Sequence, residues 1–264
     1  SLPSMSTRLH PHLRAETSGP VHTLTLDNPE ALNAQAPSLW LALAQAAREV
    51  PDTVRVVVLA AEGGSFSAGL NRAMFTPAGM PGEPPVLAMA AGDPDAFRAE
   101  IARYQEGFTA WRTLPAIVVA AVQGHAIGAG FQLALGADLR IVTEDVSFAM
   151  KEPSLGMVPD LGGTRRLVEI VGPARALDIC GTTRAIGAAE ALAIGLTQRV
   201  VPTAELTTAT AEYVAALLKA EPGALRELKP LLRDAADRSP ADQLLAEAAA
   251  QQRLLSRLVG GSPR

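Results

Sequence analysis

Short apolar runs alternate along this chain with segments of helical periodicity, and this alternation limits the possible folds more than any other feature. Runs rich in valine, isoleucine and leucine predict buried strands over 21–26, 54–60, 117–122 and 139–142. Helical patterns fill the intervals, near 36–50, 94–113 and 129–136. Strands that alternate with helices in this way form βαβ units with right-handed crossovers. The pattern therefore predicts the α/β class, and periodicity alone also fits a flat, doubly wound sheet.

Two turns of small residues follow two of these predicted strands. The first turn is Phe66-Ser67-Ala68-Gly69, and the second runs from Gly124 to Gly130. Either turn alone is explained by tight turning and close helix packing. Ligands of open α/β folds gather at the ends of strands, however, and two backbone N–H groups aimed at one point form an oxyanion hole. Together the turns predict a site that stabilises a developing negative charge.

Four motifs in a fixed order resemble the crotonase superfamily, the enoyl-CoA hydratase/isomerase enzymes. The motifs are Asn28 to Ala34, Phe66 to Asn71, Gly124 to Phe131 and Phe148 to Leu167, and the match extends from about residue 20 to the C-terminus. The resemblance implies a spiral of ββα units over residues 1–200 with the CoA and acyl site, followed by a helical oligomerisation region over residues 201–264. It also implies an acyl-CoA thioester whose carbonyl oxygen accepts hydrogen bonds from the N–H groups of Ala68 and Ala129 while an enolate forms.

The same resemblance implies which residues bind the CoA part of the substrate. They correspond to Glu30, Ala31, Leu32, Phe66, Ala68, Leu70 and Asn71. Two positions depart from the family pattern, because Asn71 stands in place of the usual aspartate and Ala129 in place of the usual glycine. We expect Ala129 in the first turn of its helix, where unpaired N–H groups and the helix dipole both favour negative charge.

The candidate acid and base residues depart from an ordinary hydratase. Glu152 stands at the family position of one catalytic glutamate, but Gln132 replaces the second. Because an amide has no titratable proton at neutral pH, Gln132 can position a water or a substrate group but cannot share acid/base duty. The substitution argues against hydration by two glutamates.

Asp160, eight residues after Glu152, is the candidate second acid. In the family an aspartate at this place is found in dienoyl-CoA isomerases, in the isomerase of ring-epoxidised phenylacetyl-CoA and in hydroxyisobutyryl-CoA hydrolases. Two carboxylates whose pKa values are pushed apart can move a proton between separated carbons, which favours double-bond migration. Asp160 is also a typical N-cap for the helix expected after it, so the two interpretations are capping alone and capping together with catalysis.

The C-terminal part of the chain contains helical patterns without strands. The helices are expected over 203–219, 222–236 and 240–258, and Ser239-Pro240-Ala241-Asp242 is a typical start signal for the last one. The apolar stripe of that helix needs a partner surface, and the resemblance implies a homotrimer or a hexamer. Residues 74–92 lack periodicity and are expected to form a mobile loop that covers an acyl tail.

Composition excludes several classes of partner. A net charge of −4 without charge runs argues against nucleic acid, and polar residues interrupt the longest apolar stretch, 115–137, which argues against a membrane span. From the single cysteine and the lack of a secretory signal we expect a cytoplasmic protein. The four histidines lack metal-ligand spacing, so we expect no metal, and no cofactor apart from CoA as part of the substrate.

The preferred interpretation is an enoyl- or dienoyl-CoA isomerase with Glu152 as the principal proton-transfer group. An enoyl-CoA hydratase of fatty-acid or aromatic-acid degradation, in which Glu152 acts on a water held by Gln132, is the first alternative. A thioester hydrolase that uses Glu152 and Asp160, and an acyl-CoA binding protein without activity, are the others.

Overall fold

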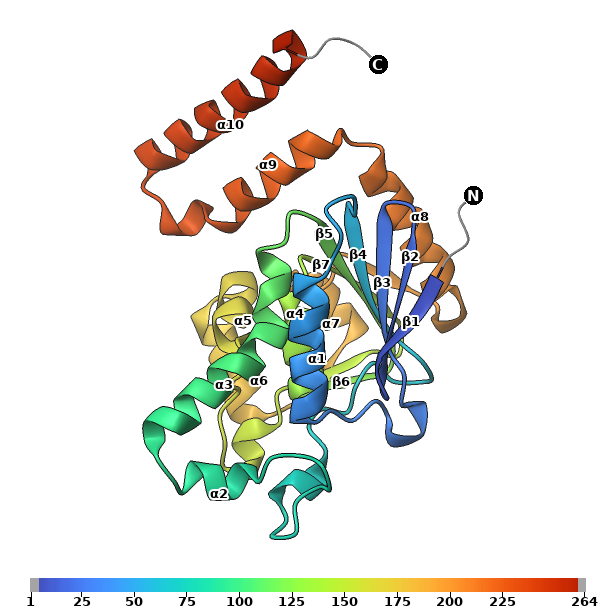
Figure 1. Ribbon diagram of the computed structural model, residues 1–264, viewed down its shortest axis with the longest axis vertical. Coiled ribbons are helices and arrows are strands. Elements are labelled where there is room, and N and C mark those ends of the chain that lie inside the picture. Colours follow the sequence, from blue (N-terminus) through green and yellow to red (C-terminus); the bar gives the residue numbers. More distant parts are fainter. Residues whose placement is uncertain (1–4, 261–264) are drawn as a thin grey trace.

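Seven strands form the main sheet, in the order β1-β2-β3-β4-β5-β7-β10 (Figure 1). The computed structural model describes the backbone of residues 5–260. The strands are β1 Met5–His10, β2 Leu13–Ser18, β3 Val21–Leu26, β4 Val56–Ala61, β5 Ile117–Val122, β7 Leu139–Thr143 and β10 Arg199–Val201. The first three strands are antiparallel, and every neighbouring pair from β3 to β10 is parallel. The α/β class predicted from the alternation is confirmed.

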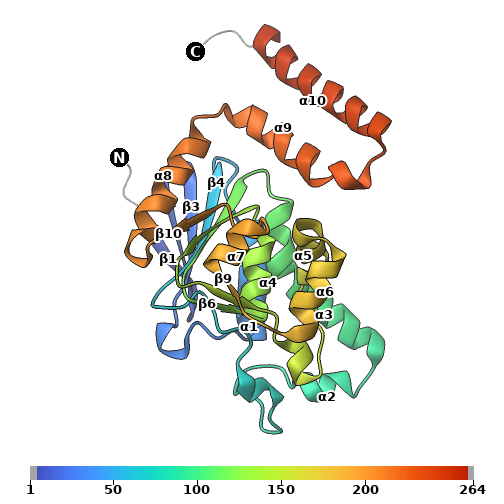
Figure 2. The same ribbon diagram turned by 180° about the vertical axis from the view of Figure 1, so that it is seen from behind.

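Helices cover both faces of this sheet, which explains why its central strands are apolar on both sides. On one face lie α1 Pro37–Arg48, α3 Pro94–Thr109 and α4 Ala129–Gly136, around a core that contains Trp40, Phe108 and Phe131. On the opposite face lies α8 Leu206–Leu218, whose Val214 packs against valines of β4 and β5 (Figure 2). The predicted helices over 36–50, 94–113 and 129–136 are thereby placed on a single face.

A second, three-stranded sheet lies beside the carboxyl ends of the main strands. Its strands are β6 His125–Ile127, β8 Ser147–Ala149 and β9 Ile186–Gly187. The remaining helices are α2 Val86–Ala90, α5 Gly163–Val171, α6 Pro173–Thr182 and α7 Ala188–Ala193. Because β6 and β8 pair in parallel, the second glycine turn and the segment that leads to Glu152 are held side by side.

The loop over 74–92 contains more structure than the sequence predicts. It begins within a 3-10 turn, Arg72–Phe75, and includes α2. In its middle, a carboxylate oxygen of Glu83 accepts a hydrogen bond from Ser38 N at 3.0 Å, in the first turn of α1. Glu83 therefore attaches the loop to α1, where it accepts a hydrogen bond from an amide of the first helical turn.

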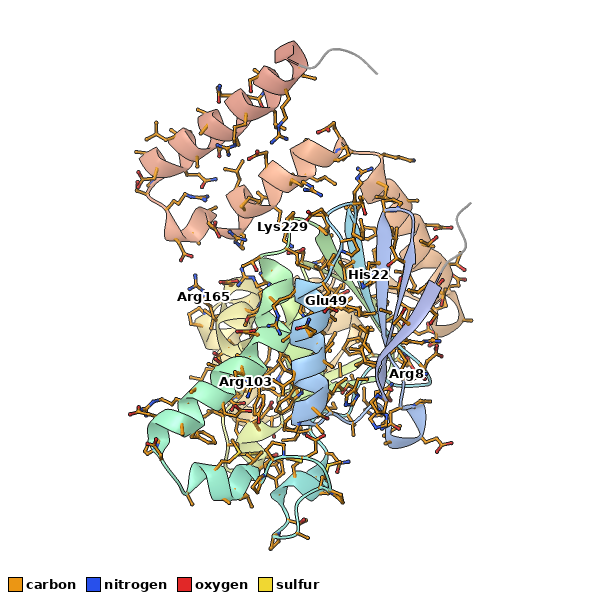
Figure 3. The ribbon with its side chains drawn as sticks, viewed as in Figure 1. Arg8, His22, Glu49, Arg103, Arg165 and Lys229 are labelled. Atoms are coloured by element: carbon orange, nitrogen blue, oxygen red, sulfur yellow. The ribbon has the colours of Figure 1, made fainter. Side chains whose placement is uncertain are left out.

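The C-terminal helices reach progressively further from the sheet. Beyond α8, α9 Pro222–Arg233 is attached by Lys229, a buried side chain that donates to Trp111 O and Ala116 O and pairs with Asp138 at 2.7 Å (Figure 3). The last helix, α10 Pro240–Gly260, packs on α9 and lies away from the sheet (Figure 1). Its predicted start is confirmed, because Ser239 Oγ accepts a hydrogen bond from Asp242 N at 3.1 Å. The predicted division of the chain into two regions at residue 200 stays a prediction. Helix α8, which follows that position, packs on the main sheet.

Within residues 5–260, no helix combines the length and the apolar character that crossing a membrane requires.

Candidate active site

The second glycine turn leads directly into the start of α4. Gly128, with φ 53° and ψ −117°, precedes Ala129, the first residue of the helix. A first-turn amide has no acceptor one turn earlier in its own helix, and it lies at the positive end of the helix dipole. The Ala129 N–H therefore lies where the sequence predicts it, at the start of a helix that begins at residue 129.

The first glycine turn corrects the prediction for Ala68. Its N–H donates to Leu32 O at 2.9 Å, so it is not free to bind a ligand. The backbone of Gln35 pairs with the residues that come after Ala68. Gln35 N donates to Gly69 O and Asn71 N donates to Gln35 O, both at 2.8 Å. Leu70 lies between these two bonds, and among residues 5–260 its N–H has no hydrogen-bond acceptor. The free donor of the first turn is Leu70, not Ala68.

The two turns meet face to face. Ser67 N donates to His125 O at 2.9 Å, and Ile127 N donates to Ser67 O at 3.0 Å, which joins the first turn to β6. Gly69 has φ 87°, and a Cβ placed on it would lie 2.5 Å from Ile127 O and 3.4 Å from Ala129 N. The residue that precedes Leu70 thus packs against the backbone of Ile127 near the Ala129 amide, at a distance that only glycine permits. The N–H group of Leu70, the next residue, therefore lies near the N–H group of Ala129.

Glu152 reaches the same place from a 3-10 turn, Glu152–Leu155, that follows β8. A Cβ on Gly128 would lie 3.3 Å from Glu152 Oε1 and 3.5 Å from Oε2, so the carboxyl packs against the residue before Ala129. Gln132 Nε2 donates to Oε1 at 2.8 Å. The other oxygen, Oε2, is buried and has no hydrogen-bond partner among the described residues. A buried carboxyl oxygen without a partner is costly, which is typical of a group that awaits a ligand.

Gln132 is buried and fixes the direction of Glu152. Its Oε1 accepts hydrogen bonds from Leu161 N at 2.9 Å and Gly163 N at 3.2 Å. Because these bonds occupy both lone pairs of the amide oxygen, the NH₂ group must face Glu152. Gln132 therefore holds the carboxyl of Glu152 and the loop after Asp160 in one network.

Burial is the main cause that raises the pKa of Glu152, and the negative charge of Asp160 raises it further. Hydrogen bonds from the backbone and from Gln132 act in the opposite direction but leave the pKa of Glu152 above its ordinary value. A carboxyl with a raised pKa is better suited to give and take protons near neutral pH.

Asp160 does not cap the following helix. The N-cap of α5 is Gly162, at φ 86°, and no side chain caps it. Asp160 is an exposed residue whose backbone oxygen accepts a hydrogen bond from Gln105 Nε2 at 2.7 Å. Partial burial of its carboxyl raises the pKa of Asp160 as well. The structure therefore removes the capping role, and Asp160 lies close enough to Glu152 for its charge to raise the pKa of that residue.

The predicted CoA-binding residues lie around the first turn. Glu30 and Ala31 belong to a 3-10 turn, Pro29–Ala31, and Leu32 follows it with 47% of its surface exposed. Leu32 O accepts the Ala68 bond, so this turn and the first glycine turn form one surface. Phe66 differs from the others because its side chain is fully buried in the core, which leaves its backbone as the part a ligand could reach.

Sequence reasoning missed Gln35 and Ser67, two fully buried polar residues beside the first turn. Their side chains hydrogen-bond to each other at 3.0 Å. The available signal was a glutamine next to a segment of helical periodicity and a serine inside the glycine turn, and neither indicates burial by itself.

Comparison with known proteins places the chain in a family of CoA enzymes. Residues 16–258 match the family model of enoyl-CoA hydratase/isomerase. Carnitinyl-CoA dehydratase of Salmonella arizonae is 36% identical over 230 residues, which cover 86% of this chain and 82% of that protein. A Thermobifida fusca protein assigned as an enoyl-CoA hydratase, solved with acetoacetyl-CoA, has 43% identity and a TM-score of 0.89 over 93% of this chain and 95% of its own. DspI of Pseudomonas aeruginosa has 28% identity and a TM-score of 0.80 over 94% of this chain and 89% of its own. The resemblance inferred from the four motifs is confirmed.

Proposed function

The chain belongs to the enoyl-CoA hydratase/isomerase family, and we propose that it moves the double bond of an enoyl- or dienoyl-CoA through an enolate. The observation that supports this most directly is the buried, unpartnered Oε2 of Glu152, which packs against the residue before Ala129 while the charge of Asp160 raises the pKa of Glu152. In this scheme the thioester oxygen accepts hydrogen bonds from Leu70 N and Ala129 N. Such donors stabilise the enolate charge and make the α-carbon more acidic.

The proton transfers in this scheme balance between the two acids. Oε2 of Glu152 removes a proton from the α-carbon, and the electron pair moves into the enolate held by the two amides. Asp160, in its protonated form, then delivers a proton to the γ-carbon as the double bond moves. Glu152 has gained one proton and Asp160 has lost one. After the product leaves, Glu152 releases its proton to solvent and the exposed Asp160 takes one up, which restores both. CoA enters as part of the substrate, and the scheme invokes no metal and no other cofactor.

The role of Gln132 favours isomerisation over hydration. A water-positioning glutamine needs a free acceptor or donor. Both lone pairs of the Gln132 oxygen are occupied by Leu161 N and Gly163 N, so only the second N–H of its NH₂ group is left to bind a water. Its NH₂ group is directed to Glu152. Gln132 is therefore better placed to orient Glu152 than to hold a water in front of it.

Hydration or dehydration is the second candidate, and the relatives favour it. One relative is named carnitinyl-CoA dehydratase, and a solved neighbour is assigned as an enoyl-CoA hydratase. In this alternative Glu152 alone handles the proton of water, and Asp160 takes no part.

Purified protein assayed with 3-enoyl-CoA and with crotonyl-CoA separates these candidates. We expect migration of the double bond to exceed hydration, loss of migration in Glu152→Gln, and a strong decrease in Asp160→Asn. Rapid hydration of crotonyl-CoA that survives Asp160→Asn would instead support the hydratase. Release of free thiol would indicate a thioester hydrolase, and tight acyl-CoA binding without turnover would indicate a binding protein.

We also propose that the protein forms a homotrimer or a hexamer through its C-terminal helices and acts in the cytoplasm. Leu244, Leu245, Leu255 and Leu258 of α10 are exposed in the single chain, which leaves an apolar surface without a partner. Sedimentation of wild type should give the mass of three or six chains, and Leu255→Glu should shift it toward one chain. Leu177→Glu, at an exposed leucine of α6, is the matched control. A wild-type monomer would contradict the proposal.

A further inference from the structure

Gln35 is a fully buried glutamine that makes a hydrogen bond at each end of its side-chain amide. Its Nε2 donates to Ser67 Oγ at 3.0 Å, and its Oε1 accepts from Trp40 Nε1 at 2.8 Å. The indole N–H can only donate, so it fixes which end of the amide faces Ser67. Trp40 thereby sets the orientation of Gln35.

The hydroxyl of Ser67 receives this bond as part of a saturated set. Ser67 Oγ donates to Asn33 O at 2.8 Å and accepts from Gly69 N at 3.1 Å in addition to the bond from Gln35. One donor and two acceptor sites are all that a serine hydroxyl offers. Because Ser67 is fully buried, a lost partner could not be replaced by solvent.

Ser67 also connects the two turns. Its main chain pairs with His125 and Ile127 of the strand that leads to Ala129, while its side chain holds Gly69, the residue before Leu70. The main chain of Gln35 pairs on both sides of Leu70, with Gly69 O and Asn71 N. The position of the Leu70 amide relative to the Ala129 amide therefore depends on Gln35 through its backbone and its side chain.

We propose that Gln35 is a positioning residue for the Leu70 donor, with Trp40 and Ser67 as the partners that hold it. This inference rests on the proposed function, because it assumes that the Leu70 and Ala129 amides bind a thioester oxygen. Gln35 itself contacts no substrate in this account. Its effect is confined to the distance and angle between two donors, and a misplacement of about 1 Å can lower a rate by about 100-fold.

The test compares the affinity for acetoacetyl-CoA, which carries the thioester, with the affinity for CoA, which lacks it. Wild type should bind acetoacetyl-CoA more tightly than CoA. Gln35→Leu should reduce that preference, and kcat on the enoyl-CoA substrate, by about 10-fold to 100-fold, while the affinity for CoA stays the same. Trp40→Phe keeps the ring packing, removes the N–H donor, and should reduce the preference to a smaller extent. Gln45→Leu, at an exposed glutamine of α1, is the control that should change neither affinity.

The outcomes distinguish a failure of the Gln35 role from a failure of the proposed function on which it rests. A wild type that binds both compounds equally contradicts the proposed function itself. A wild type that prefers acetoacetyl-CoA, together with a Gln35→Leu variant that keeps this preference, overturns only the role of Gln35. Equal weakening of both affinities in Gln35→Leu would indicate general structural damage and would also overturn it. If Gln35→Leu does not fold, an unchanged preference in Trp40→Phe overturns the inference in its place.

Discussion

The two turns that border the site hold their free amides in different ways. In the second turn the Ala129 donor is fixed by helix geometry, because the first residue of α4 has no acceptor within its own helix. In the first turn the Leu70 donor is left free by hydrogen bonds of the Gln35 backbone, from another segment, and of the Ser67 hydroxyl within the turn. A donor of the first kind needs little besides its own helix. A donor of the second kind needs a network, and it should be the more sensitive of the two to distant substitutions.

The largest effect should come from pushing the two turns apart. Gly69→Ala adds a Cβ that would lie 2.5 Å from Ile127 O, at a φ of 87° that alanine rarely adopts. We expect kcat to fall by about 100-fold to 1000-fold, the range seen when one oxyanion donor is lost. Steady-state kinetics on the enoyl-CoA substrate measures this.

Gly64→Ala is the control for that experiment, because a Cβ at this position meets no atom within 4 Å. Near wild-type activity in Gly69→Ala would mean that the space between the turns is not where the thioester binds.

A smaller effect should appear when a methyl group is added at Gly130, the residue after Ala129 in the first turn of α4. Alanine normally stabilises a helix relative to glycine by about 1 kcal/mol. At Gly130, however, the added Cβ would lie 2.4 Å from Ser67 O, so Gly130→Ala should destabilise the protein by about 1–3 kcal/mol. Urea unfolding measures the free energy.

Gly181→Ala in α6 is the matched substitution, since it meets no atom within 4 Å and should leave stability equal or slightly higher. If Gly130→Ala also raises the stability, the two turns are not packed as tightly as the structure indicates.

The smallest effect concerns the pH dependence of stability around Glu152. The folded state raises the pKa of this carboxyl, so the folded protein binds the proton more tightly than the unfolded chain does. The contribution of Glu152 to stability is therefore present at acid pH and is lost as the pH rises through the raised pKa. Glu152→Gln lacks this loss and should gain stability relative to wild type between acid and neutral pH. Unfolding free energies in a pH series test this, and a constant difference would show that Glu152 is not perturbed.

The sequence predicted the parts of this molecule that local patterns determine. The bounds of β3, β5 and α4 agree with the runs that predicted them, because each run is a continuous apolar or helical pattern. The strands β6, β8 and β9 were missed because two or three residues are too few to show periodicity. The strands β1 and β2 were missed because they carry many polar residues.

The site follows the same division. The Ala129 donor could be placed because its position is set by the start of a helix. The prediction that the Ala68 N–H is a free donor was wrong because this group bonds to Leu32 O, which belongs to another motif. The capping role of Asp160 was wrong because Gln132, in a different helix, binds the amides of Leu161 and Gly163. Local rules therefore identified the region, and long-range hydrogen bonds decided which atoms are free within it.

The most direct test of the account is a crystal structure of this protein with acetoacetyl-CoA bound. We predict that the thioester oxygen lies within hydrogen-bonding distance of both Leu70 N and Ala129 N, with Oε2 of Glu152 facing the α-carbon. A thioester oxygen bound elsewhere, or a Glu152 carboxyl separated from the α-carbon by other side chains, would contradict it.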